Sequence, residues 1–186
     1  MERLGALPAE SLDDAQRRVA ATLAAGPRGA LRGPFVPLLR SPELCDRTQH
    51  LGEFLRYQCS VPERLRELAI IQTARLWQQT YEWHVHAPLA LRAGVASETI
   101  AALAAGHRPE RLQDDEALII DFCVELHGHH SVSDGTYARA LALLGERGVV
   151  DLVGLCGYYA LLAMVLNVAQ SALPAGSQPA FAAAWE

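Results

Sequence analysis

The sequence has few aromatic residues and few runs of strand-forming residues. Aromatic side chains make up 6% of the 186 residues, whereas alanine and leucine are abundant. Alanine and leucine favour helices, and β-branched and aromatic residues favour strands. The composition therefore predicts an all-α protein, and a hydrophobic content of 51% is enough for a substantial core. A chain of this length predicts a single domain, residues 1–186.

An excess of positive charge is also absent. The formal net charge is −5, and the 16 Lys and Arg residues are scattered along the chain, so nucleic acid is not an expected partner. The first ten residues, MERLGALPAE, lack the apolar core of a secretory signal. The patterns GxGxxG, Walker A, HEXXH and GxSxG are missing, which argues against the enzyme classes that use them.

The four cysteines, at positions 45, 59, 123 and 156, include no pair three residues apart. This spacing excludes a CxxC redox motif and a zinc knuckle. Cysteines without a disulfide pattern are typical of a reducing compartment, and we expect a cytoplasmic protein.

One long apolar run, Val149 to Ala169, has two interpretations. It is about long enough to cross a bilayer. However, Asp151 and Asn167 lie inside it, and polar groups are costly in lipid. Gly154 and Gly157 indicate close packing of another helix. We therefore expect a long buried helix rather than a membrane anchor.

Capping and breaking signals divide the chain into about eight helices. Residues 26–37, with three prolines and three glycines, predict an irregular loop. A helix from about Thr80 to Ala93 should end at Gly94. The other expected starts are Ser11 with Asp14 as capping-box partner, Ser41-Pro42, Ser60 with Glu63, Ser97, Asp114 or Asp115, and Ser133.

The densest polar cluster in an apolar setting is QTYEWHVH, residues 79–86. On a helix, Gln79, Glu82 and His86 share one face. Glu82 is therefore predicted to hydrogen-bond His86 and to raise its pKa, as in a general acid/base pair. The alternative is an ordinary helix-surface pair of Glu and His.

Glu67 interrupts the apolar segment LRELAII and is the second candidate. A buried carboxylate needs a partner or must stay protonated. We predict that Glu67 faces the groove between its helix and the next and meets Glu82 and His86 in one pocket. The alternative is a surface ion pair with Arg64 or Arg66.

The histidines at positions 127, 129 and 130 have a possible metal interpretation. They stand near a predicted helix C-terminus, where imidazolium also favours the helix dipole. No carboxylate or cysteine spacing completes a ligand set. We therefore expect neither a metal site nor a cofactor.

The string PERLRELAIIQTARLWQQTYEWHVHAPLALRAGV resembles the core of the carboxymuconolactone decarboxylase family, which includes alkylhydroperoxidase-D-like proteins. The string VSDGTYARALALLGERGVVDLVGLCGYYALLAMVLN resembles the family's C-terminal half. The YEWxxH motif, with a glycine eight residues after the histidine, is the most specific feature. The resemblance implies an alkylhydroperoxidase-D-like helical bundle with a core at about 35–172, assembled as a homotrimer or homohexamer.

The resemblance also implies a site. In thiol-active relatives, a Glu and a His flank a cysteine pair with the spacing of Glu67 and His86 here. The cysteine positions correspond to Gln79 and Glu82, so a disulfide relay is not expected.

The decarboxylases of this family imply a cofactor-free lyase acting on a small carboxylated lactone or aromatic-derived compound. His86, Glu82 and Glu67 would be catalytic, and Tyr81, Trp83, Gln79 and Arg75 would contact the substrate. A degenerate peroxidase and a non-catalytic oligomeric binding module remain alternatives.

Overall fold

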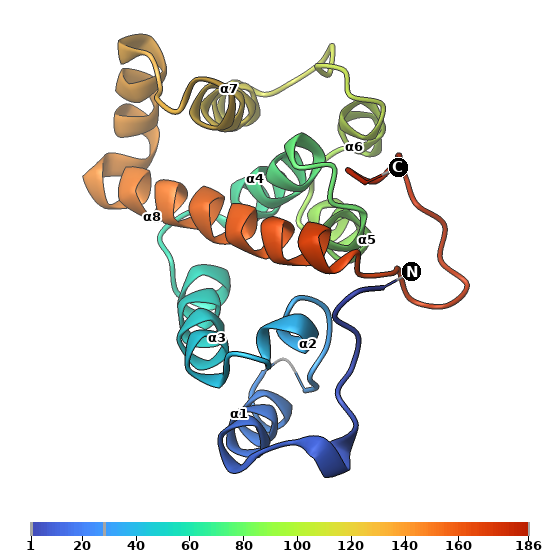
Figure 1. Cartoon of the computed structure of the whole chain (residues 1–186). Coiled ribbons are helices and arrows are strands. Elements are labelled where there is room, and N and C mark those ends of the chain that lie inside the picture. Colours follow the sequence, from blue (N-terminus) through green and yellow to red (C-terminus); the bar gives the residue numbers. More distant parts are fainter. Residues whose placement is uncertain (1, 28, 186) are drawn as a thin grey trace.

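The computed structural model describes residues 2–27 and 29–185, which form eight α-helices, one short 3-10 turn and no β-strand. The predicted all-α helical bundle is thus confirmed. The elements are the 3-10 turn Ala9–Ser11 and the helices α1 Asp14–Ala25, α2 Phe35–Leu38, α3 Pro42–Tyr57, α4 Glu63–Leu76, α5 Thr80–Arg92, α6 Ser97–Ala104, α7 Asp114–His129 and α8 Asp134–Ala169 (Figure 1).

Two predicted helix starts are wrong. Helix α1 begins after Asp13, whose side chain accepts from the Gln16 backbone in a capping box, while Ser11 ends the preceding 3-10 turn. Ser60 does not cap α4, because its hydroxyl and backbone N–H both donate to the Asp151 carboxylate at 2.7 Å. In both cases a neighbouring carboxylate is the stronger acceptor, so it competes with the local cap.

The loop predicted over 26–37 contains the start of a helix. Helix α2 is only four residues long, but Phe35 and Leu38 are buried in the core. Their burial stabilises a helical turn that the local proline and glycine content did not predict. This turn matters below because it carries one wall of a pocket.

Helix α4 lies at the centre of the bundle and packs against α5, α6, α7 and α8 (Figure 1). Its apolar side chains are buried all around the helix, including Leu68, Ile70 and Ile71. A helix that is apolar on every side is stable only when neighbours surround it. Polar groups in the buried stretch 67–74 of α4 therefore lie inside the protein, where they need partners.

Helix α8 combines the two helices predicted on either side of residue 145. Gly145 has φ 68° and ψ 174°, a backbone conformation that is essentially restricted to glycine. The helix bends at this point, and the second segment crosses the front of the bundle in Figure 1.

By length and composition alone, α8 is apolar enough to span a membrane. However, 61% of its most apolar window is buried inside the fold. One such helix is weak evidence for a membrane span, because the core helix of a globular bundle has the same composition.

The turn between α4 and α5 is held from the far end of α8. Gln79 caps α5 by accepting from the Tyr81 backbone N–H at 2.7 Å, and its amide donates to Asn167 at 2.7 Å. Asn167 in turn donates to the Trp77 carbonyl at 2.9 Å. This network sets the position of α5 relative to both α4 and α8, and with it the position of the polar side chains on α5.

Candidate active site

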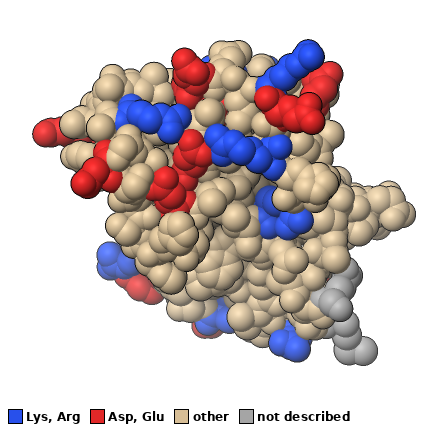
Figure 2. All heavy atoms as spheres, turned by 90° about the horizontal axis from the view of Figure 1, so that it is seen from above, with Lys and Arg blue, Asp and Glu red and all other residues tan. Residues whose placement is uncertain are grey.

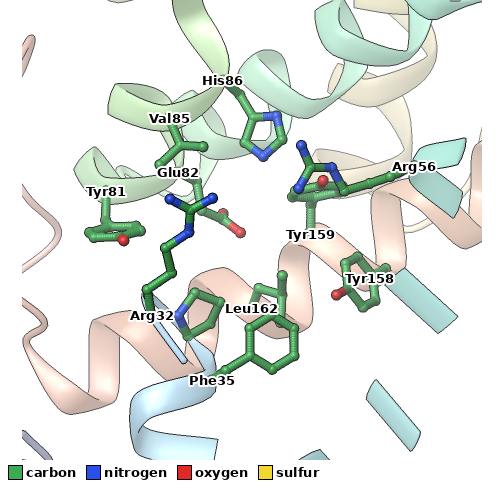
Figure 3. A pocket seen from close by; sticks show the side chains of 12 residues that line it. Arg32, Phe35, Arg56, Tyr81, Glu82, Val85, His86, Tyr158, Tyr159 and Leu162 are labelled. Atoms are coloured by element: carbon green, nitrogen blue, oxygen red, sulfur yellow. The ribbon is translucent and has the colours of Figure 1, made fainter. Parts of the chain in front are cut away.

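The structure brings Glu67 of α4 and His86 of α5 into direct contact. The distance from His86 Nδ1 to Glu67 Oε2 is 2.7 Å, and both side chains are buried. A carboxylate on Nδ1 orients the ring and selects the nitrogen that carries its proton. The other ring nitrogen, Nε2, is directed into a pocket between α5 and α8 (Figure 3).

Glu82 lies one turn before His86 on the same helix and is only 3% exposed. Neither of its carboxyl oxygens has a hydrogen-bond partner among the described residues. The hydrogen bond that the sequence predicted from Glu82 to His86 is therefore absent, and Glu67 occupies that role. Desolvation by burial raises the pKa of Glu82 well above its ordinary value. Burial thus favours the neutral form of this side chain, which has a proton to donate.

The pocket around these groups has a cavity volume of about 70 Å³. A single water needs at least about 10 Å³ measured this way, so the pocket holds several waters or a small organic molecule. It is lined by Arg32, Gly33, Pro34, Phe35, Arg56, Tyr81, Glu82, Val85, His86, Tyr158, Tyr159 and Leu162.

Two arginines enter the pocket from different elements, Arg32 from the segment before α2 and Arg56 from α3 (Figure 3). In the described part of the chain neither forms an ion pair with a carboxylate. Because burial disfavours the charged form of Glu82, the two guanidinium groups dominate the charge of the pocket. Guanidinium groups bind carboxylates through paired hydrogen bonds, so an organic anion is the ligand that this lining favours.

Tyrosines of α8 form the wall opposite His86. The Tyr159 ring packs edge-to-face on two neighbouring rings. Its centroid lies 5.1 Å from that of the His86 ring and 5.3 Å from that of the Tyr158 ring. Burial raises the pKa of Tyr159 well above its ordinary value. Its hydroxyl therefore stays protonated and is available as a hydrogen-bond donor.

Tyr81 closes the pocket near the segment that carries Arg32. Gly33 has φ 58°, and a Cβ added there would lie 2.7 Å from the Tyr81 ring. Glycine is therefore required at this position both by the backbone conformation and by the close approach of the ring.

Three of the predicted substrate-contacting residues lie away from this pocket. Gln79 is fully buried in the α4–α5 turn, as described above. Trp83 is buried edge-to-face against Phe181 at 5.3 Å. Arg75 stacks over the Phe181 ring, with its guanidinium carbon 4.9 Å from the ring centroid, and its Nε donates to the Ala104 carbonyl. Of the predicted substrate-contacting residues, Tyr81 lines the pocket together with Glu82 and His86, and the other three do not.

The sequence did not single out Arg32, Arg56, Tyr158 or Tyr159. The only local signal was a pair of tyrosines, each with a polar hydroxyl, inside an apolar run. The two arginines have no local signal, because an arginine in a loop and one at a helix end are usually solvated.

A metal centre has no support from the described residues, since no three His, Cys, Asp or Glu side chains are grouped there to hold an ion. His127 instead contacts Thr73 at 3.3 Å and packs edge-to-face with Trp77. The chemistry available at the pocket is therefore that of an acid, an imidazole and two guanidinium groups.

The comparison with known families agrees with this geometry. The family model described as the carboxymuconolactone decarboxylase family matches residues 42–109, a segment that includes Arg56, Glu67, Glu82 and His86. No curated protein matches the sequence. The resemblance of residues 132–167 to the family's C-terminal half lies outside the match and stays a prediction. The matched segment, residues 42–109, is thus similar to the carboxymuconolactone decarboxylase family.

Proposed function

We propose that the protein is a cofactor-free lyase that removes CO₂ from a small carboxylated substrate, either a lactone or a compound derived from an aromatic ring. The observation that carries this proposal is that Glu82 is buried without a hydrogen-bond partner, beside His86 in a pocket lined by two arginines. A general acid next to an anion-binding lining is what decarboxylation followed by protonation requires.

The steps follow from the chemistry of these groups. Arg32 and Arg56 bind the substrate anion and orient it against α5. The bond to the departing carboxylate breaks, CO₂ leaves, and the electron pair delocalises into a neighbouring carbonyl as an oxyanion. Glu82 donates its proton to the substrate carbon, and the His86–Glu67 pair returns a proton to Glu82 from solvent.

Release of CO₂ from carboxymuconolactone by the purified protein tests this function. We expect turnover with this compound or with related lactones that carry a carboxylate. The same lactones without the carboxylate should release no CO₂. Saturable binding of the carboxylates without CO₂ release would contradict the lyase and would support the alternative, a non-catalytic binding module.

Replacing Arg56 with glutamine is expected to raise KM by roughly 10- to 100-fold, because a hydrogen bond to a charged group is worth about 1.5–3 kcal/mol. Steady-state CO₂ release measures this change. Arg47→Gln is the matched control, since Arg47 lies on the same helix, is exposed and pairs with Glu43. An equal effect of both substitutions would show that Arg56 does not bind the substrate.

We also propose that the protein is a homotrimer or homohexamer in the cytoplasm and does not bind nucleic acid or membranes. Both signs of charge are interspersed on the face shown in Figure 2, beside a wide uncharged area. On α8, the exposed apolar side chains at positions 150, 153, 164 and 168 share one helix face. Val150 is 69% exposed and Val168 is 63% exposed, which favours burial against another subunit.

The double substitution of Val150 and Val168 by lysine is expected to dissociate the oligomer, because two charges would be buried in an apolar interface. Sedimentation velocity of the wild type and the variant measures the change. Val124→Lys, at an exposed valine of α7, is the control and should leave assembly unchanged. A monomeric wild type would contradict the proposed assembly.

A further inference from the structure

Two cysteines meet in the core, away from the pocket described above. Cys123 of α7 and Cys156 of α8 are 33 residues apart in the chain, and their sulfurs lie 3.7 Å apart. They are 0% and 1% exposed, and neither lines the pocket of His86. The pair therefore belongs to a different part of the molecule, between α4, α7 and α8.

Polar groups surround the two thiols within this apolar core. Thr73 of α4 and His127 of α7 interact with each other at 3.3 Å, and both interact with the Cys156 thiol. Cys123 lies 4.0 Å from the Ala69 carbonyl. A buried cysteine with a purely structural role packs against apolar neighbours, whereas here a hydroxyl and an imidazole are directed at the sulfur.

The surroundings also make the two thiols unequal. The hydrogen bond from Cys123, together with His127 and Thr73, lowers the pKa of Cys156 against the opposing effect of burial. The same hydrogen bond and burial raise the pKa of Cys123 well above its ordinary value. Cys156 thus carries the nucleophilic thiolate, and Cys123 remains a thiol.

We propose that Cys123 and Cys156 form a second, redox-active site, at which a small hydroperoxide oxidises the pair to an intrachain disulfide between α7 and α8. The sulfurs must approach by roughly 1.7 Å to reach bonding distance. Rotation about the two Cα–Cβ bonds with a small helix shift supplies this movement, because the thiols already touch.

The reaction balances without a further reactant. The Cys156 thiol passes its proton to His127, and its sulfur attacks the terminal peroxide oxygen. The O–O bond breaks, and the alkoxide takes that proton and leaves as an alcohol. Cys123 then attacks the sulfenic acid on Cys156, the S–S bond forms, and water leaves. Two thiols lose two electrons in total, and one hydroperoxide is reduced to an alcohol and water.

The route to the thiols limits the oxidant to a small molecule. His127, which interacts with the Cys156 thiol, is itself partly exposed and packs edge-to-face on the partly exposed Trp77. The His127 side chain therefore lies between Cys156 and solvent. Reaction past this side chain is slow compared with an exposed CxxC pair. The site therefore adds a stoichiometric oxidation to the protein, and it does not restore the peroxidase cycle that the missing CxxC excludes.

Exposure of the reduced, full-length protein to hydrogen peroxide tests the proposal. We expect the oxidised chain to be lighter than the reduced chain by two hydrogens. Alkylation in denaturant should then modify two fewer cysteines than in the reduced protein. Peptide mapping is expected to link Cys123 to Cys156. Cys59→Ala, at a partly exposed cysteine, should give the same yield of this disulfide.

Variants of the pair separate its two roles. In Cys123→Ala, a dione reagent is expected to trap sulfenic acid on Cys156, because the resolving thiol is missing. In Cys156→Ala, Cys123 is expected to stay reduced. The rate of wild-type oxidation should fall at low pH, and His127→Gln should move this fall to higher pH, because the side chain that lowers the pKa of Cys156 is missing.

Two results would overturn the proposal. One is oxidation confined to Cys59, with Cys123 and Cys156 still alkylated in denaturant. The other is oxidation of the pair only after the protein has been unfolded. Neither result depends on the lyase activity, so the redox site and the proposed function fail or stand separately.

Discussion

Replacing His86 with glutamine is expected to lower kcat by roughly 100- to 10,000-fold, the usual contribution of a general acid or base. Glutamine keeps an amide donor for Glu67 but has no proton to exchange. The buried hydrogen bond to Glu67 is therefore retained in this variant, and we expect the free energy of unfolding to change by no more than about 1 kcal/mol. Steady-state CO₂ release and urea unfolding measure the two quantities.

His86→Ala provides the contrast. It leaves the Glu67 carboxylate buried without its imidazole, which costs about 3–5 kcal/mol in comparable buried pairs. Glu67→Gln should impair turnover less than either His86 variant, because the ring stays in place. His84→Gln, at an exposed histidine of the same helix, is the control. Full activity of His86→Gln would show that the imidazole takes no part in the reaction.

Replacing Glu82 with glutamine is expected to stabilise the protein and to inactivate it. Glutamine has the shape of the neutral acid but cannot ionise or donate its proton to carbon. Burial raises the pKa of Glu82 in the folded state above its ordinary value near 4.5. Between these two pKa values the unfolded chain releases a proton that the folded protein keeps. Wild-type stability therefore falls as pH rises, by up to about 1.4 kcal/mol per pH unit.

The difference in free energy of unfolding between Glu82→Gln and the wild type should therefore be small below pH 4.5 and should grow at neutral pH. Urea unfolding at several pH values measures it. Glu110→Gln removes an exposed carboxylate and should show no such growth. A difference that does not change with pH would mean that Glu82 is ionised in the folded protein.

Gln79 and Glu82 correspond to the two cysteine positions of the motif that this sequence resembles. The two residues have separate roles here. Gln79 holds the α4–α5 turn to Asn167 of α8, and Glu82 supplies a buried acid to the pocket. Glu67 and His86 remain paired at 2.7 Å. The proton-transfer part of the site is thus separated from thiol chemistry, which we assign to Cys123 and Cys156.

Local patterns were sufficient for the features that depend on residues close together in the chain. Composition and capping signals predicted the all-α fold, and the spacing of Glu82 and His86 placed them on one face of α5. The interruption of LRELAII by Glu67 indicated a buried carboxylate, because a charge inside an apolar helix needs a partner whatever the fold. Helix starts were less predictable where distant groups competed, as Asp151 does for Ser60.

Only the tertiary structure decided which groups face one another. Arg32 and Arg56 reach the pocket because α2 and α3 pack against α8, and both side chains point into it in Figure 3. Their sequence surroundings are those of ordinary solvated arginines. The contact of Cys123 with Cys156 arises from the packing of α7 on α8. A sequence pattern reports how one element is divided between core and solvent, whereas these contacts depend on how separate elements pack against one another. The ligand-binding lining and the thiol pair are therefore properties of the packing, and the acid and imidazole of α5 are properties of the local sequence.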